Sequence, residues 1–178
     1  KAMRNIAKEK RGVVVLSGLL GSFFPAYLFC IAETKIDSAL AGIMNALTPL
    51  FVIITGISFF QLQVKKLQLI GIIVGFIGLS LLVAAGSNIS LEYFSYSLLV
   101  LLATLFYGIN VNMVGKHMQG IGSLEIASMA FVFLLIPCSI ILYFTGYFAL
   151  PLTEDAYLLS TGASAVLGIF GTAVASVL

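Results

Sequence analysis

The chain has 178 residues, of which 61% are hydrophobic and only 9% are charged, and its net charge is +2. A soluble domain carries about a quarter charged residues, and one of roughly this length still exposes about a third of its chain to water. This much apolar surface cannot be hidden in a soluble core. The composition therefore excludes a soluble globular protein, a disordered chain and a nucleic-acid-binding protein, and it indicates an integral membrane protein.

Six long apolar runs follow one another along the chain. An α-helix of about 20 residues crosses the hydrocarbon core of a bilayer, which is about 30 Å thick. The runs are continuous rather than alternating in polarity, which excludes the strands of a membrane barrel. We therefore predict an all-α polytopic transmembrane helix bundle. The six predicted helices are residues 12–32, 39–60, 67–86, 94–115, 122–143 and 157–178.

The short polar segments around these runs alternate in net charge. Residues 1–11 carry +4, and the following segments carry −1, +2, −1, +1 and −2 in turn. Basic loops stay on the cytoplasmic side of a membrane. We therefore expect a multi-pass protein of the cell inner (plasma) membrane with residues 1–11 in the cytoplasm. Because the chain starts without Met and ends inside an apolar run, we also expect it to be a piece of a longer protein.

The second run carries a stripe of small and polar residues on an otherwise aliphatic helix. Pro49 cannot donate a backbone hydrogen bond, so it frees the carbonyl of Asn45 four residues earlier. A polar, kinked patch near the middle of the membrane is typical of a translocation site. The alternative is that Asn45 hydrogen-bonds a neighbouring helix and only holds the bundle together. The stripe consists of Ser38, Ala41, Gly42, Asn45, Thr48 and Pro49.

The fourth run contains two asparagines that cannot face the same way. Tyr107 and Asn110 are three residues apart and share a helix face, whereas Asn112 points to the side of Gly108 and Gly115. We assign Asn112 to helix packing. The predicted substrate cavity is then lined by Asn45, Thr48, Pro49, Tyr107 and Asn110.

The third run has a glycine stripe at Gly71, Gly75 and Gly78. Small residues at this spacing let another helix approach closely, so we predict that these three glycines serve helix packing.

Chemistry-bearing motifs are missing from the sequence. Glu33 and Glu125 lie at the ends of predicted helices, and no HExxH motif, paired carboxylates or Cys/His ligand set occurs. An integral-membrane enzyme acting on lipid-linked substrates would need such groups. We therefore expect no enzyme activity, no metal and no cofactor. The partners that we expect are a small-molecule metabolite and the lipid bilayer, with no nucleic acid, and a homodimer is left open.

A short motif occurs twice. Residues 18–22 (GLLGS) and 168–172 (GIFGT) lie 150 residues apart, in helices predicted to run in opposite directions. An odd number of helices per repeat inverts the second copy, as in the inverted repeats of secondary transporters.

The chain resembles the drug/metabolite transporter superfamily, in particular its EamA-type members. Their ten helices form two inverted five-helix repeats, so the resemblance implies that this chain is helices three to eight, with 1–86 ending the first repeat and 94–178 starting the second. It implies a permease or exporter that moves small organic metabolites, such as amino acids, by alternating access. A structural membrane subunit is the other alternative besides an enzyme. One departure is residues 61–63 (QLQ), where such proteins often carry an acidic residue. The resemblance rests on residues 38–51 (SALAGIMNALTPLF), 68–78 (QLIGIIVGFIG), 102–108 (LATLFYG) and 167–173 (LGIFGTA).

Overall fold

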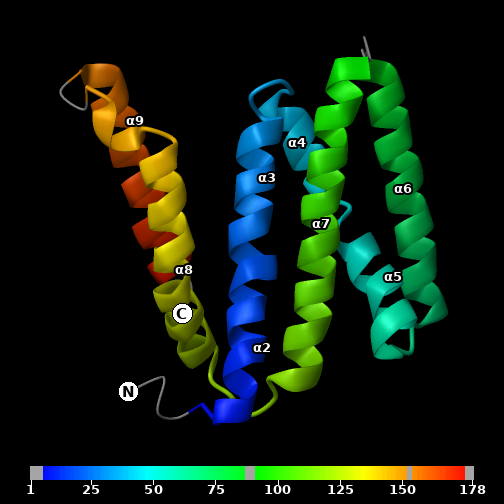
Figure 1. The fold of residues 1–178 in the computed structure, drawn as a ribbon. Helices are drawn as coiled ribbons and strands as arrows, with labels where there is room; N and C mark the ends of the chain where they lie inside the picture. Colours follow the sequence, from blue (N-terminus) through cyan, green and yellow to red (C-terminus); the bar gives the residue numbers. More distant parts are fainter. Residues whose placement is uncertain (1–5, 87–90, 152–153, 175–178) are drawn as a thin grey trace. The chain divides into compact units, whose positions relative to one another are not determined.

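The computed structural model describes residues 6–86, 91–151 and 154–174, and within them the chain consists of helices joined by short turns (Figure 1). Two segments, η1 and η3, are π-helical, and η2 is a 3-10 helix. In chain order the elements are α2 (Lys8–Gly18), η1 (Leu19–Phe23), α3 (Phe24–Ala32), α4 (Ser38–Asn45), α5 (Thr48–Phe60), α6 (Lys66–Gly86), α7 (Leu91–His117), α8 (Ser123–Phe144), η2 (Tyr147–Ala149), α9 (Asp155–Val166) and η3 (Leu167–Val174).

The prediction of an all-α membrane bundle is confirmed. Four helical stretches in the described part of the chain are long and apolar enough to cross a bilayer: Lys8–Ala32, Ser38–Phe60, Phe94–His117 and Ser123–Phe144. Two further helices are apolar over shorter described stretches, Lys66–Gly78 and Tyr157–Phe170. The protein is therefore a multi-pass membrane protein.

The chain forms two compact units, one of residues 19–119 and one of residues 1–18 with 120–178. These units reflect packing, whereas the predicted boundary between 1–86 and 94–178 reflects a duplication. The division into two repeats stays a prediction.

In the unit of residues 19–119, α7 lies between α3 and α5 (Figure 1). A Cβ atom at Gly108 would lie 2.7 Å from the carbonyl carbon of Phe51, and the rings of Phe60 and His117 are 6.3 Å apart, so α5 and α7 run parallel. The ring of Phe24 in α3 lies 5.8 Å from that of Phe106. Gly21, earlier in the same span, lies against Asn110, so α3 and α7 run antiparallel.

These directions agree with the alternation of loop charges. The final turns of α5 and α7 are neighbours, and the Lys116 ammonium lies 5.8 Å from the centre of the Phe60 ring. Lys65 follows α5 after four residues. Both basic segments therefore lie at the same end of this unit, as the charge pattern requires.

The opposite end of the unit is closed by an apolar cluster and a helix cap. The Asp37 carboxylate accepts a hydrogen bond from the Ala39 backbone N–H at 2.7 Å, which caps the start of α4. The buried cluster joins the ends of α3 and α4 to the first turns of α7. Its members are Ala32, Ile36, Ala41, Met44 and Val100.

The other unit is built on the contact of α2 with α8. A Cβ at Gly18 would lie 2.9 Å from the Cβ of Ala130, so the two helices approach closely there. Further along, the Tyr147 hydroxyl of η2 lies 3.0 Å from the Thr161 hydroxyl of α9.

The prolines interrupt their helices differently. Pro25 lies in the first turn of α3, directly after η1, and Pro49 lies in the first turn of α5, directly after a turn. Pro137 lies inside a continuous α8. A change of helix type precedes Pro25, and a break in the span precedes Pro49.

The contact at Gly108 gives a test of the fold. Gly108→Ala should lower the free energy of unfolding, because the new Cβ meets backbone atoms of Phe51 and Val52 that cannot rotate away. Gly115→Ala is the matched control on the same helix, since a Cβ there meets nothing within 4 Å and Ala in a helix is favoured over Gly by about 1 kcal/mol. Thermal unfolding of both variants in detergent should show a lower midpoint for Gly108→Ala alone.

Candidate functional site

The second span is broken near its middle. α4 ends at Asn45, residues 46–47 form a turn, and α5 begins at Thr48. Pro49 has no N–H for the Asn45 carbonyl, and the Thr48 hydroxyl replaces it, donating to that carbonyl at 2.7 Å. The same hydroxyl lies 3.2 Å from the side-chain oxygen of Asn45. The Thr48 hydroxyl therefore supplies the hydrogen bond that Pro49 cannot donate to the Asn45 carbonyl.

The break leaves polar groups at membrane depth. Asn45 and Pro49 are exposed and Thr48 is half-buried. Ala46 and Leu47 keep αR dihedral angles, and their N–H groups donate to carbonyls of residues 42–44, so the break is a tightened turn within one span. That the Asn45–Pro49 segment lines a substrate cavity stays a prediction.

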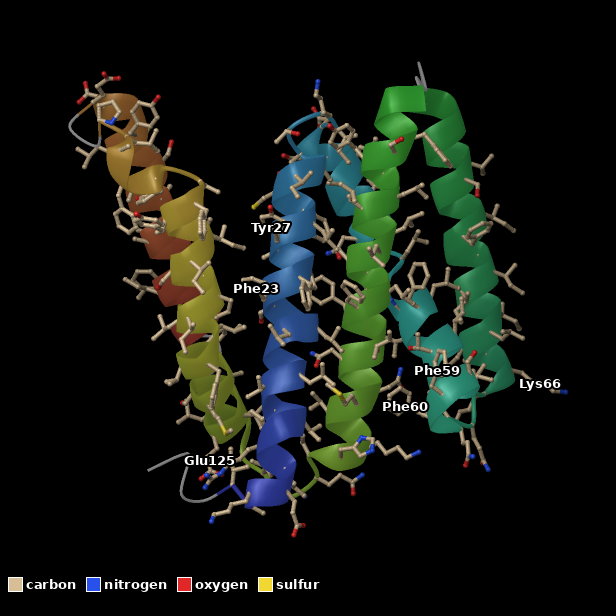
Figure 2. All side chains as sticks on the ribbon, viewed as in Figure 1. Phe23, Tyr27, Phe59, Phe60, Lys66 and Glu125 are labelled. Carbon is tan, nitrogen blue, oxygen red and sulfur yellow. The ribbon has the colours of Figure 1, made fainter. Side chains whose placement is uncertain are left out.

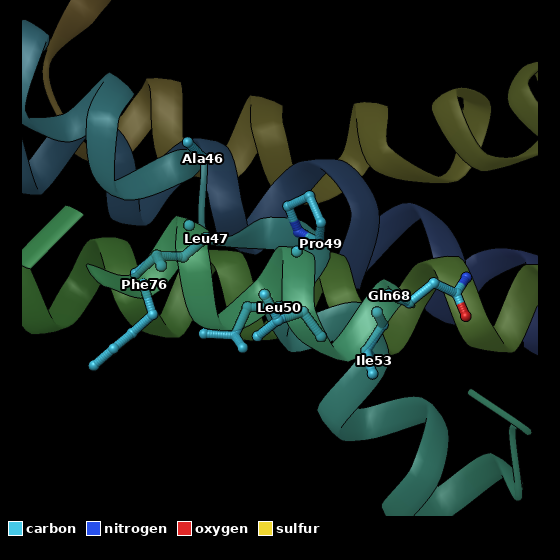
Figure 3. Close-up of a pocket in the computed structure, with 10 residues that line it drawn as sticks. Ala46, Leu47, Pro49, Leu50, Ile53, Gln68 and Phe76 are labelled. Atoms are coloured by element: carbon cyan, nitrogen blue, oxygen red, sulfur yellow. The ribbon is translucent and has the colours of Figure 1, made fainter. Parts of the chain in front are cut away.

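A groove lies beside the break, between the α4–α5 corner and α6 (Figure 3). Its volume is about 290 Å³, and its lining is apolar except for Gln68. Among the predicted site residues, Pro49, Gly71 and Gly75 line it. The other lining residues are Ala46, Leu47, Leu50, Ile53, Gln68, Ile72 and Phe76.

The glycine stripe of α6 faces open space in this structure. A Cβ at Gly71, Gly75 or Gly78 would meet no atom within 4 Å. Their predicted packing role stays a prediction. The glycines that do permit close approach in this unit are Gly21, Gly56 and Gly108.

Asn112 joins α7 to α5, which confirms its assignment to packing. Its amide nitrogen donates to the Val52 carbonyl at 2.7 Å, to the Gly108 carbonyl at 2.9 Å and to the Thr55 hydroxyl at 3.0 Å. The Thr55 hydroxyl in turn donates to the Phe51 carbonyl at 2.7 Å. Asn112 is 9% exposed. The amide is thus buried and paired.

Asn110 faces the other side of α7. Its side chain lies against Gly21, where any Cβ would clash with the amide. Its side-chain oxygen is buried and has no hydrogen-bond partner among the described residues. Tyr107, one turn earlier, is half-buried. The structure therefore brings Asn45 to Thr48 and Asn110 to Gly21, and the convergence of all five predicted residues stays a prediction.

The repeated motif coincides with an unusual backbone. Residues 18–22 overlap η1, and residues 168–172 lie within η3, so both copies are π-helical. Single π-helical turns occur frequently at functional sites. The glycine spacing alone does not predict a π-helical turn, because Gly75 and Gly78 have the same spacing in the α-helical α6.

Glu33, Glu125 and His117 lie at helix ends. Glu33 follows α3 and accepts a hydrogen bond from the Ser38 hydroxyl at 2.9 Å. Glu125 is in the first turn of α8 and His117 in the last turn of α7. Within the described residues there is no group of three or more His, Cys, Asp or Glu side chains that could hold a metal ion.

Comparison with known proteins gives one match. Residues 1–84 match the EamA-like transporter family, and these residues include the broken second span and most of α6. Neither the curated proteins nor the solved structures gave a match. The resemblance recognised in the sequence is thus confirmed over the first part of the chain. Residues 1–84 are thus similar to the EamA-like transporter family, a family of membrane transporters.

Proposed function

We propose that the protein moves a small organic metabolite, such as an amino acid or a related compound, across the membrane by alternating access. The observation that carries this proposal is the break between α4 and α5, which lies inside the segment matched to the transporter family. Secondary transporters build substrate sites from such discontinuous membrane helices, near the middle of the bilayer. The exposed Asn45 side chain is then a ligand for substrate.

The orphan oxygen of Asn110 supports a second contact with substrate. A buried acceptor without a partner destabilises the folded protein by about 1–3 kcal/mol. A functional role for the Asn110 oxygen would explain why it is nevertheless present. Asn112, two residues on, shows that the amide nitrogen of an α7 asparagine finds acceptors where the side chain serves packing. A substrate N–H or O–H group donating to the Asn110 oxygen would supply the reason.

The break can be tested at Asn45. Asn45→Leu in the full-length protein should reduce uptake into proteoliposomes more than it reduces folded yield, because the Asn45 carbonyl keeps its Thr48 partner. Polar contacts between membrane helices average only about 0.6 kcal/mol, so a small change in yield is expected. Thr48→Val is the comparison, since it strips that carbonyl of its donor and should lower stability by about 1 kcal/mol. A parallel fall of yield and uptake in Asn45→Leu would make Asn45 a purely structural residue.

The two asparagines of α7 should respond in opposite ways. Asn110→Leu removes an unpaired acceptor, so its unfolding midpoint should stay equal to or rise above that of the parent while uptake falls about tenfold or more. Asn112→Leu removes bonds to Val52, Thr55 and Gly108, so its midpoint should fall. Thermal unfolding and proteoliposome uptake, measured on the same preparations, distinguish a ligand role for Asn110 from a packing role. A stability loss in Asn110→Leu equal to that in Asn112→Leu would contradict the ligand role.

The orientation proposed from the loop charges is tested by labelling. With single cysteines placed in a background without Cys30 and Cys138, positions 65 and 116 should react with a membrane-impermeant thiol reagent only from the cytoplasmic side. Position 154 should react from outside. Labelling of position 65 in intact cells would reverse the orientation.

A further inference from the structure

The groove beside α6 has a volume of about 290 Å³ and an almost wholly apolar lining, which does not suit a polar metabolite. A metabolite site needs several convergent polar groups, and here Gln68 is the one polar side chain in the lining. Its amide oxygen is already occupied, because it accepts the backbone N–H of Lys65 at 2.9 Å.

The groove runs along α6 from a polar end into the apolar part of the helix. From Gln68 to Phe76 it follows eight residues, or about 12 Å of helix rise. Gly71 and Gly75 form its floor, since neither carries a side chain and a Cβ at either would meet nothing within 4 Å. The groove is therefore long, narrow and apolar, and it is aligned with the membrane helix, as an acyl chain is.

The polar end carries two positive charges. Lys65 and Lys66 are exposed at the start of α6, and Figure 2 shows Lys66 extending outward from this helix end. The hydrogen bond from Lys65 to Gln68 places the Lys65 backbone at the mouth of the groove. The positive end of the α6 dipole adds to the two cations.

We propose that this groove holds one acyl chain of an anionic phospholipid from the surrounding bilayer, with its phosphate held by Lys65 and Lys66. Basic pockets between membrane helices bind anionic lipid headgroups, and here an apolar groove continues directly from the basic end. The site is separate from the Asn45 and Asn110 side chains, which do not line the groove.

Native mass spectrometry of the full-length protein with dioleoylphosphatidylglycerol and dioleoylphosphatidylcholine tests the proposal. Phosphatidylglycerol should be retained preferentially, and each of Lys65→Gln and Lys66→Gln should weaken its binding about fivefold. Lys116→Gln is the charge control, because that lysine lies over Phe60. It should leave retention unchanged.

Filling the groove gives an independent test with a matched control. Gly75→Leu should reduce binding of both lipids, whereas Gly78→Leu, on the same stripe but outside the groove, should not. Both glycines have open space around them, so both variants should fold. Equal retention of the two lipids by the parent and its lysine variants would overturn the headgroup site. If the parent protein is a dimer and both Gly75→Leu and Gly78→Leu are monomers, the acyl-chain site is overturned, because the glycine stripe is then a contact with a second copy of the chain.

Discussion

The crossing of α7 over α5 at Gly108 is the contact on which the larger unit depends. In a bilayer, helices are not driven together by the hydrophobic effect, and close backbone approach with hydrogen bonds between helices must replace it. Gly108 lets the backbones of the two helices touch at Phe51 and Val52. That approach brings the Asn112 amide within reach of α5. Together with the contact between the Phe60 and His117 rings, this crossing sets the parallel direction of the two helices and the common end of Lys65 and Lys116.

The same crossing gives the two faces of α7 different roles. Asn112 is directed at α5, where three acceptors satisfy it. Asn110, two residues earlier, is directed at η1, where Gly21 leaves room for its amide but offers no side-chain donor. One face of α7 therefore stabilises the unit, and the other carries an unsatisfied acceptor. This asymmetry is what separates a packing asparagine from a candidate ligand in an otherwise uniform apolar helix.

The sequence predicts features that depend on local chemistry, but it does not predict contacts that depend on which helix lies opposite. The helices, the Asp37 cap and the break at Pro49 follow from hydropathy, capping chemistry and a missing N–H, so they could be predicted. The assignment of Asn112 to packing needed only the helical period. Helical period also singled out the stripe of Gly71, Gly75 and Gly78, yet the close contacts in this unit form at Gly21, Gly56 and Gly108. Spacing identifies a helix face, but it does not say what lies opposite.

The π-helical segments can be compared with the break at Pro49 to ask whether a proline or a glycine pair interrupts the α-helix. Thr48 precedes Pro49 and its hydroxyl caps the freed carbonyl, so the chain there needs only a two-residue turn. Phe24 precedes Pro25 and has no donor, and the turn before it is π-helical. A proline alone is not the cause, because η3 is π-helical and its residues 167–174 contain no proline. What the two segments share is a pair of glycines three residues apart, followed by Ser22 in one copy and Thr172 in the other. A glycine pair alone is not the cause either, because Gly75 and Gly78 have the same spacing inside the α-helical α6. What the two π-helical segments share is the glycine pair together with the hydroxyl residue that follows it.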